Sequence, residues 1–361
     1  MIKILGSGLA GLSAAILLRK GGHEVIIKEK AEFIGTVVDD IQAIRNYEHD
    51  YDQLDFFSRE GITLKYTKPI YSIVKYAPSG KSMTVQSENS MPIFYALKRG
   101  KEEKAVDHQL YKQALNSGVK INFNSKEDLT KTDADIISVG PLFHNIWAFG
   151  GVYEVKDVDP ETILFFMNND YCPKGYIYLV PYGRKEVTIA ATTFDMKCNL
   201  APLFFRFLKE NKIVADILQD AKLLRYTSGH SYSNMPETAE INGKKVVGSS
   251  AGFLDPARGF GIKYAIWSGI LAAKSIMNKV SYDELWRNAF GKDLSESIIR
   301  RIFLEKMLNE DYEKMILSDK VSIKKYEKIP SILRKKMMEL KISWELGRFR
   351  KEYDLQKKLQ N

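Results

Sequence analysis

The chain begins with an alternation of apolar and glycine-rich segments. Ile2 to Leu5 forms a short apolar run typical of a buried strand, and residues 12–22 have the composition of a helix. Residues 23–29 read as a second strand that ends in an acid. A strand, a glycine-rich turn, a helix and another strand in this order predict the start of a parallel βαβ unit.

Later segments show other patterns. Residues 62–84 and 162–193 are rich in strand-forming residues, and the turn sequences at 77–80 and 182–185 suit hairpins of an antiparallel sheet. From Tyr282 onward the pattern is helical, with Pro330 marking a break. The chain therefore combines a βαβ-type region, an antiparallel sheet and a helical end.

Composition narrows the class of protein. With 361 residues, 45% of them hydrophobic, the chain can bury two or three domain cores. The longest mostly apolar stretches, residues 9–18 and 264–273, fall short of the ~18 residues that span a bilayer. Cys172 and Cys198 form neither a disulfide framework nor a metal-site pattern. We expect a cytoplasmic protein without a transmembrane helix or a metal site.

Positive charge is concentrated at one end. The formal net charge is +9, and residues 322–361 hold twelve Lys or Arg against five acids. A solvated helix face explains this composition best, and peripheral contact with anionic lipid headgroups is the alternative. No basic stripe with interleaved aromatics is present, so we expect no nucleic-acid partner.

The first turn carries a nucleotide-binding pattern. Gly6 would make the tight turn, Gly8 would let the backbone approach a diphosphate, and Gly11 would let the helix pack closely on the strand. Glu29, 18 residues after the last glycine, is placed to accept hydrogen bonds from ribose hydroxyls. Its charge disfavours a 2′-phosphate, which leaves NAD or FAD.

A second glycine-rich segment distinguishes these cofactors. Residues 246–248 form a short apolar strand, a turn extends to Ile262, and residues 263–277 are helical. The turn resembles the GDAAG…DP…G(E)GI segment of flavoproteins with the glutathione-reductase-type FAD fold. Together with the first turn and Ala265-Ile266-x-Ser268-Gly269, it resembles the geranylgeranyl reductase family. In that family the second turn lies over the flavin, and the following helix points its N-terminus at the ring.

Two middle segments support the same resemblance. Arg99-Gly100 followed by residues 106–110 resembles the family's R…D..L segment, and residues 135–140 resemble its last sheet strand. Residues 173–181 are similar to the PxxYxWxFP motif, with Tyr178 for Trp and Val180 for Phe. Alternate strand residues share a face, so the residues at 176, 178 and 180 would line one wall of a cavity.

The resemblance implies a set of site residues. FAD is the implied cofactor, held by Gly6, Ser7, Gly8, Leu9, Ala10, Gly11, Glu29, Lys30, Arg99, Gly140, Ser249, Asp255, Gly259, Phe260, Gly261 and Ile262. The implied substrate wall is Pro173, Tyr176, Tyr178, Val180 and Pro181. Tyr178 and Tyr176 are the candidate proton donors, with Tyr47 and His144 as rivals.

The implied architecture is α/β. We expect a discontinuous Rossmann-like FAD-binding domain of residues 1–61, 95–150 and 235–280. An antiparallel β substrate domain of residues 62–94 and 151–234 is inserted into it, and residues 281–361 form a basic helical region. The implied activity is hydrogenation of isolated double bonds in a polyprenyl lipid by hydride transfer from reduced flavin N5, with the electron donor left open.

Departures from the family keep alternatives open. Gly248-Ser249 stands where the family has Gly-Asp, and Gly140-Pro141 replaces the Asp-Gly pair of flavin hydroxylases. The loss of a charged acceptor for the ribityl hydroxyls is expected to weaken FAD binding. The alternatives are a flavin monooxygenase or halogenase-like enzyme on another apolar substrate, and a non-catalytic relative that binds FAD or lipid.

Overall fold

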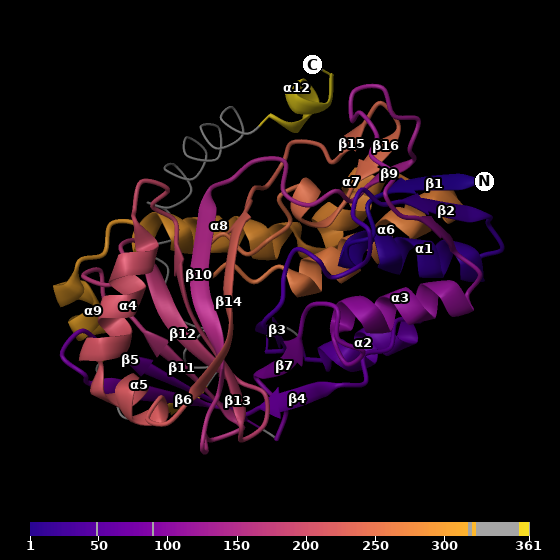
Figure 1. Ribbon diagram of the computed structural model, residues 1–361. Coiled ribbons are helices and arrows are strands. Elements are labelled where there is room, and N and C mark those ends of the chain that lie inside the picture. The colour runs from indigo at the N-terminus through magenta and orange to yellow at the C-terminus, as the bar shows by residue number, and fades with distance from the viewer. Residues whose placement is uncertain (48–49, 89, 317–319, 323–353, 361) are drawn as a thin grey trace.

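The computed structural model describes residues 1–47, 50–88, 90–316, 320–322 and 354–360. Figure 1 shows its two main parts: a large sheet on one side, and a smaller sheet with α1, α3 and α6 on the other. The mixed α/β architecture predicted from the sequence is confirmed.

The smaller sheet has six strands in the order β15-β16-β9-β1-β2-β8, all parallel except the β15–β16 pair. Its strands are β1 (Ile2–Leu5), β2 (Val25–Lys28), β8 (Lys120–Asn122), β9 (Ile136–Ile137), β15 (Glu240–Ile241) and β16 (Lys244–Val246). The helices beside it are α1 (Leu9–Lys20), α3 (Val106–Asn116) and α6 (Ile262–Asn278). The βαβ start predicted for the N-terminus is present as β1, α1 and β2.

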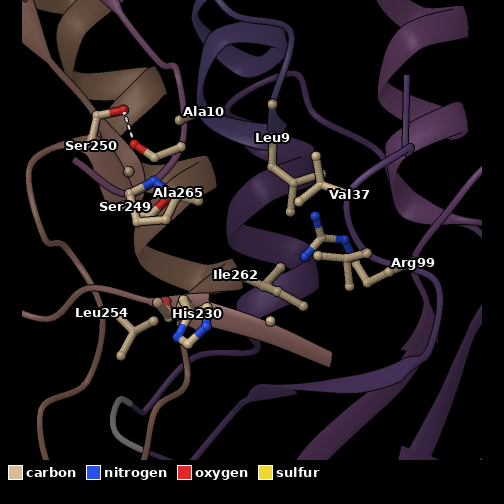
Figure 2. Close-up of a pocket in the computed structure, with 18 of the residues that line it drawn as sticks. Leu9, Ala10, Val37, Arg99, His230, Ser249, Ser250, Leu254, Ile262 and Ala265 are labelled. Atoms are coloured by element: carbon tan, nitrogen blue, oxygen red, sulfur yellow. Dashed lines mark hydrogen bonds between the residues drawn. The ribbon is translucent and has the colours of Figure 1, made fainter. Parts of the chain in front are cut away.

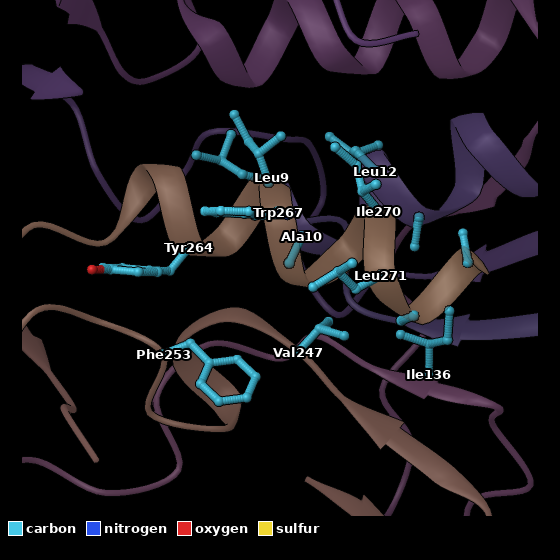
Figure 3. Close-up of a cluster of buried hydrophobic side chains, with 14 of the residues drawn as sticks. Leu9, Ala10, Leu12, Ile136, Val247, Phe253, Tyr264, Trp267, Ile270 and Leu271 are labelled. Atoms are coloured by element: carbon cyan, nitrogen blue, oxygen red, sulfur yellow. The ribbon is translucent and has the colours of Figure 1, made fainter. Parts of the chain in front are cut away.

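Helices α1 and α6 pack closely although about 250 residues separate them. A side chain at Gly269 would clash with the backbone carbonyl of Ala10, so glycine permits this approach. Around the crossing, Leu9, Trp267 and Ile270 join one buried apolar cluster (Figure 3). Burial of this cluster fixes the beginning of the chain against its later third.

The larger sheet has eight strands in the order β14-β10-β13-β12-β11-β5-β6-β17. These are β5 (Ser72–Tyr76), β6 (Ser82–Gln86), β10 (Ile146–Glu154), β11 (Thr162–Phe166), β12 (Gly175–Pro181), β13 (Glu186–Thr193), β14 (Lys222–Ser231) and β17 (Lys320–Ser322). The predicted turns do join the β5–β6 and β12–β13 hairpins. The sheet is not wholly antiparallel, because β5 pairs with β11, and β6 with β17, in parallel.

A third, three-stranded sheet connects the two parts. It consists of β3 (Ile41–Arg45), β7 (Phe94–Lys98) and β4 (Thr67–Ile70), all antiparallel. Helix α2 (Gln53–Arg59) follows β3 and begins at Asp52, whose carboxylate accepts the backbone N–H of Leu54.

The remaining helices join or cover the sheets. They are α4 (Leu200–Glu210), α5 (Lys212–Ile217), η1 (Gly248–Ser250), α7 (Tyr282–Trp286), the π-helical η2 (Arg287–Gly291), α8 (Lys292–Leu304), α9 (Asn309–Met315) and α12 (Leu355–Gln360). Phe204 and Phe207 of α4 are buried with Ile177, Leu179 and Ile189 on one face of the eight-stranded sheet. The opposite face of this sheet is left for the cavity described below.

Two predicted regions, residues 146–150 and 322–361, correspond only in part to the described structure. Residues 146–150, predicted within the FAD-binding domain, belong to β10 of the eight-stranded sheet, because the strand starts before the predicted boundary. The basic region 322–361 and the break at Pro330 lie largely or wholly outside the described residues. Among the helices that are described, none combines the length and the apolar character needed to cross a bilayer.

Candidate functional site

A cavity of about 880 Å³ lies where the six-stranded sheet meets the open face of the eight-stranded sheet. Leu9 and Ala10 of the first glycine-rich turn line it, and so do Ser249 and Ile262 of the second (Figure 2). Two segments about 240 residues apart in the sequence therefore face the same space. This volume lies within the range of small-molecule and cofactor sites.

The first turn is held tightly from behind. Gly6 has φ +98°, and a side chain there would clash with the backbone carbonyl of Ser138. Gly11 supports the turn rather than lining the cavity, because its N–H donates to Ser138 Oγ at 3.0 Å and a side chain would clash with the Gly6 carbonyl. At Gly8, by contrast, an added Cβ would be at ordinary contact distance.

The start of α1 forms a potential anion site. Gly8 is its N-cap and has no side chain to cap it, while Ser138 Oγ accepts the N–H of Gly11, the third residue of the helix. The first N–H groups of a helix lack partners within the helix, and the dipole makes this end positive. Because Gly8, Leu9 and Ala10 line the cavity, this helix end suits a diphosphate.

Glu29, predicted to accept hydrogen bonds from the ribose hydroxyls, lies beside the first turn. Its Oε2 accepts the Ser7 N–H at 2.7 Å and the Ser7 hydroxyl at 2.8 Å, and its Oε1 accepts the Ala31 N–H at 2.8 Å. These bonds fix the carboxylate against the first turn, and Oε1 retains acceptor capacity. Glu29 and Lys30 both line the cavity.

The second turn closes the same cavity from the other side. Gly248 has φ +58°, and Ser249 follows it on the cavity wall. The Ser250 hydroxyl donates to the Gly140 carbonyl at 2.8 Å, which ties the turn to the loop after β9 (Figure 2). Helix α6 then begins at Gly261 with no side-chain cap among the described residues, so a second positive helix end meets the cavity.

Asp255, predicted to bind the cofactor, instead supports this turn from beneath. It is fully buried and absent from the described lining, and Arg45 of β3 pairs with its Oδ2 at 2.5 Å. Its Oδ1 accepts the N–H groups of Ala257 at 2.8 Å and Arg258 at 3.2 Å, and the Ser297 hydroxyl. Burial would raise the pKa of Asp255, but the two arginines and these hydrogen bonds lower it to about 2.

Arg99 lies at the cavity edge, as predicted, but much of its guanidinium is engaged. Nε and Nη2 donate to the two oxygens of Asp107 at 2.8 and 3.0 Å, and Nη1 donates to Gln42 at 3.3 Å. This bidentate pair holds Arg99 in place beside Val37 (Figure 2). A contact between Arg99 and the cofactor remains a prediction.

The predicted tyrosine wall is present in part. Tyr176, Tyr178 and Val180 alternate along β12 and line the cavity together with Phe165 of the neighbouring strand. The Tyr176 hydroxyl donates to the carbonyl of Arg258 and so joins this wall to the second turn. Burial raises the pKa of Tyr178 above its usual value, and the nearby Asp40 adds to that shift.

Four other candidates occupy different positions. Pro173 and Pro181 stand at the ends of the strand segment, outside the lining formed by the described residues. Tyr47 also lies outside that lining and packs edge-on against Phe94. His144 does line the cavity, with its ring 5.3 Å from that of His230.

Sequence reasoning missed Asp40 and its hydrogen-bond partner Thr227. Both line the cavity, and the Thr227 hydroxyl donates to Asp40 Oδ2 at 3.3 Å. The available signal was an Asp-Asp pair directly before an apolar strand, which alone is also typical of an ordinary surface turn.

The chain is similar in sequence to known proteins. A family model described as an NAD(P)-binding Rossmann-like domain matches residues 4–58. The digeranylgeranylglycerophospholipid reductase of Methanocaldococcus jannaschii is 23% identical, over 94% of this chain and 96% of the relative. The enzyme of that name from Methanococcus vannielii is 24% identical, over 92% and 96%.

Solved structures share the fold. A geranylgeranyl bacteriochlorophyll reductase-like protein from Thermoplasma acidophilum superposes with a TM-score of 0.71 at 18% identity, covering 87% of this chain and 90% of that one. A flavin-dependent brominase superposes with a TM-score of 0.64 at 15% identity, covering 94% and 93%.

The fold and the two turns define an FAD-dependent oxidoreductase with a Rossmann-like cofactor domain. The residues present fit that cofactor, because two helix N-termini and the fixed Glu29 carboxylate surround one cavity. Within this class, the chain is similar along nearly its whole length to proteins named digeranylgeranylglycerophospholipid reductases.

Proposed function

We propose that the protein saturates isolated double bonds of a polyprenyl lipid of the geranylgeranyl type. The observation that carries this proposal is the meeting of both glycine-rich turns with an apolar wall in one cavity. Phe165, Tyr178 and Val180 provide that wall. The near full-length similarity to relatives named digeranylgeranylglycerophospholipid reductases supports the substrate class.

The chain's own groups would divide the binding of FAD among them. The N-terminus of α1 would hold the diphosphate, Glu29 would accept the ribose hydroxyls, and Ser249 would accept from the ribityl chain. The uncapped start of α6 would favour negative charge at the ring. When bound and reduced, FAD supplies a hydride from N5 to one alkene carbon.

The protein's remaining contribution is orientation and exclusion of water. Tyr176 is anchored on the Arg258 carbonyl, so the tyrosine wall and the second turn keep a fixed separation. A flexible prenyl chain lying between two fixed surfaces would present one double bond at a time. The apolar lining would keep water away from the transferred hydride.

A direct test begins with the visible absorption of the purified protein, before and after addition of FAD. The protein would then be reduced with dithionite without oxygen and mixed with a geranylgeranyl phospholipid. We expect a gain of two hydrogens per reduced double bond by mass spectrometry, and a lipid with saturated chains is the control. Failure to take up FAD would favour the non-catalytic alternative, and oxygen-dependent hydroxylation would favour a monooxygenase.

A further inference from the structure

Asp40 is a buried carboxyl group that no step described so far uses. It is 5% exposed, and its Oδ1 has no hydrogen-bond partner within the described part of the chain. Its backbone is fixed, because its carbonyl accepts the Arg99 N–H at 2.8 Å. The next residue, Ile41, donates its N–H to Thr188 Oγ1 at 2.8 Å. The side chain is therefore held firmly but poorly hydrogen-bonded.

Strand register places Asp40 over the substrate wall. Its partner Thr227 pairs with Gly150, Gly150 pairs with Ala190, and Ala190 pairs with Tyr178. These four residues form one row across the sheet, and a methyl group is the largest side chain between Thr227 and Tyr178. Asp40, Ala190 and Tyr178 all line the cavity. The Asp40 carboxyl and the ring of Tyr178, the first candidate proton donor, therefore line the same cavity.

The surroundings of Asp40 favour its neutral form. Burial is the largest influence on its pKa and raises it. The charge of Arg99 and the side chains of Gln42 and Thr227 act in the opposite direction, and Asp107 adds to the rise. Arg99 is already paired with Asp107, and Arg225 of β14 pairs with Asp39 at 2.7 Å while its Nη2 has no partner among the described residues.

We propose that Asp40 is the catalytic acid that protonates the substrate in the reduction proposed above. As hydride adds to one alkene carbon, the π electron pair forms a bond from the other carbon to the proton of Asp40. The Asp40 O–H bond breaks and leaves a carboxylate, which takes a proton from water before the next turnover. The hydroxyl of Thr227 hydrogen-bonds that carboxylate. This role deepens the proposed function and rests on it.

Acid strength favours Asp40 over Tyr178. A phenol starts from a pKa near 10, and burial moves that of Tyr178 higher. A carboxyl starts near 3.8, so a rise brings its pKa closer to neutral pH. A general acid works best when its pKa is near the working pH.

The first experiment compares Asp40→Asn with Asp157→Asn, a matched change at an exposed position outside the described lining. Each protein is loaded with FAD, reduced without oxygen, and mixed with geranylgeranyl phospholipid. We expect Asp40→Asn to slow the reduction roughly 10²- to 10⁴-fold, with FAD affinity and KM unchanged. Asp157→Asn should match the wild type.

The pH profile is a second readout. The wild-type rate should fall as pH rises through the pKa of Asp40, and Asp40→Asn should lose this dependence. Thr227→Val removes a hydrogen bond that favours the carboxylate, so it should move the fall to higher pH. This variant retains Asp40 and therefore tests the proposal if Asp40→Asn does not fold.

A third readout needs neither cofactor nor substrate. Infrared spectroscopy across a pH titration should show a protonated carboxyl band that survives to a higher pH than those of exposed carboxyls, that Asp40→Asn removes and that Asp157→Asn keeps. Absence of such a band, or equal rates for wild type and Asp40→Asn, would overturn the donor role alone. An FAD-loaded wild type that reduces no prenyl lipid would overturn the proposed function and the donor role with it.

Discussion

Asp255 and Asp40 are both buried aspartates at the cofactor cavity, and their pKa values move in opposite directions. Asp255 is paired with Arg45 and accepts two backbone N–H groups, so its pKa falls to about 2. Asp40 has one long hydrogen bond from Thr227, and burial raises its pKa. Similar burial therefore gives a permanent anion at one position and favours a neutral acid at the other.

The difference separates two uses of a buried carboxyl group. A fully satisfied carboxylate can hold a loop in place, as Asp255 holds the turn that leads into α6. A poorly satisfied carboxyl can keep or release a proton near neutral pH. The number of hydrogen-bond and ion-pair partners, rather than the depth of burial, distinguishes Asp255, the structural anchor, from Asp40, the candidate acid.

The largest expected effect comes from breaking the anchor. Arg45→Met removes the closest cation from the buried Asp255 carboxylate and should lower the free energy of unfolding by about 3–5 kcal/mol. Urea denaturation would measure it. Arg184→Met is the matched control, because Arg184 pairs with Asp157 at the exposed surface and the pair should contribute less than about 1 kcal/mol. Equal losses in the two variants would contradict the anchoring role.

The second-largest effect concerns the loss of stability when Asp255 is protonated at low pH. The pKa of Asp255 drops from 3.8 to about 2 on folding, so its ionised form stabilises the protein above pH 4. That stabilisation, roughly 2 kcal/mol, should disappear as pH falls from 4 to 2. Comparing unfolding of the wild type and Asp255→Asn across this window measures it. An identical slope in both proteins would argue against the depressed pKa.

The third prediction introduces a carboxylate at position 249, where the expected hydrogen-bond donors are the ribityl hydroxyls of bound FAD. Ser249→Asp restores the charged acceptor typical of the family and should tighten FAD binding by about 1.5 kcal/mol, or roughly tenfold. Fluorescence titration would give the dissociation constants, and Ser249→Asn is the uncharged control. Weaker binding in the aspartate variant would remove Ser249 from the proposed ribityl site.

The smallest expected effect concerns Asp40. Its contribution to the free energy of unfolding should change with pH in the opposite direction to that of Asp255. Because the folded-state pKa of Asp40 is raised, the folded protein holds this proton more tightly than the unfolded chain. Stability should therefore fall as pH rises from 3.8 through the folded-state pKa. Asp40→Asn should lose that fall and exceed the wild type in unfolding free energy at pH 8. A loss of stability at pH 8 would show that the carboxylate is better compensated than its contacts indicate.

Local patterns allowed much of the fold to be predicted. The glycines at 6 and 11, the βαβ order and the acid at 29 depend on short-range geometry, and the structure shows each in its expected place. The alternation along β12 also predicted a shared face for Tyr176 and Tyr178. These features need only strand period and turn chemistry.

Features that depend on distant partners were not predictable. The family resemblance implied Asp255 as a cofactor ligand, and nothing near it in sequence revealed its partner Arg45, 210 residues earlier. The environment of Asp40 depends on its hydrogen bond with Thr227 and on a register that spans several strands. The parallel pairing of β5 with β11 likewise joins segments that no local pattern connects.

The parallel pairing of β16 with β9 has a consequence for how this protein is made. Ile137 and Val246 lie side by side, so the six-stranded sheet stays incomplete until more than 240 residues have left the ribosome. The first turn emerges at once, but its opposite wall arrives much later. Synthesis therefore delays a closed nucleotide site until the final third of the chain, and contacts of such wide sequence separation slow folding.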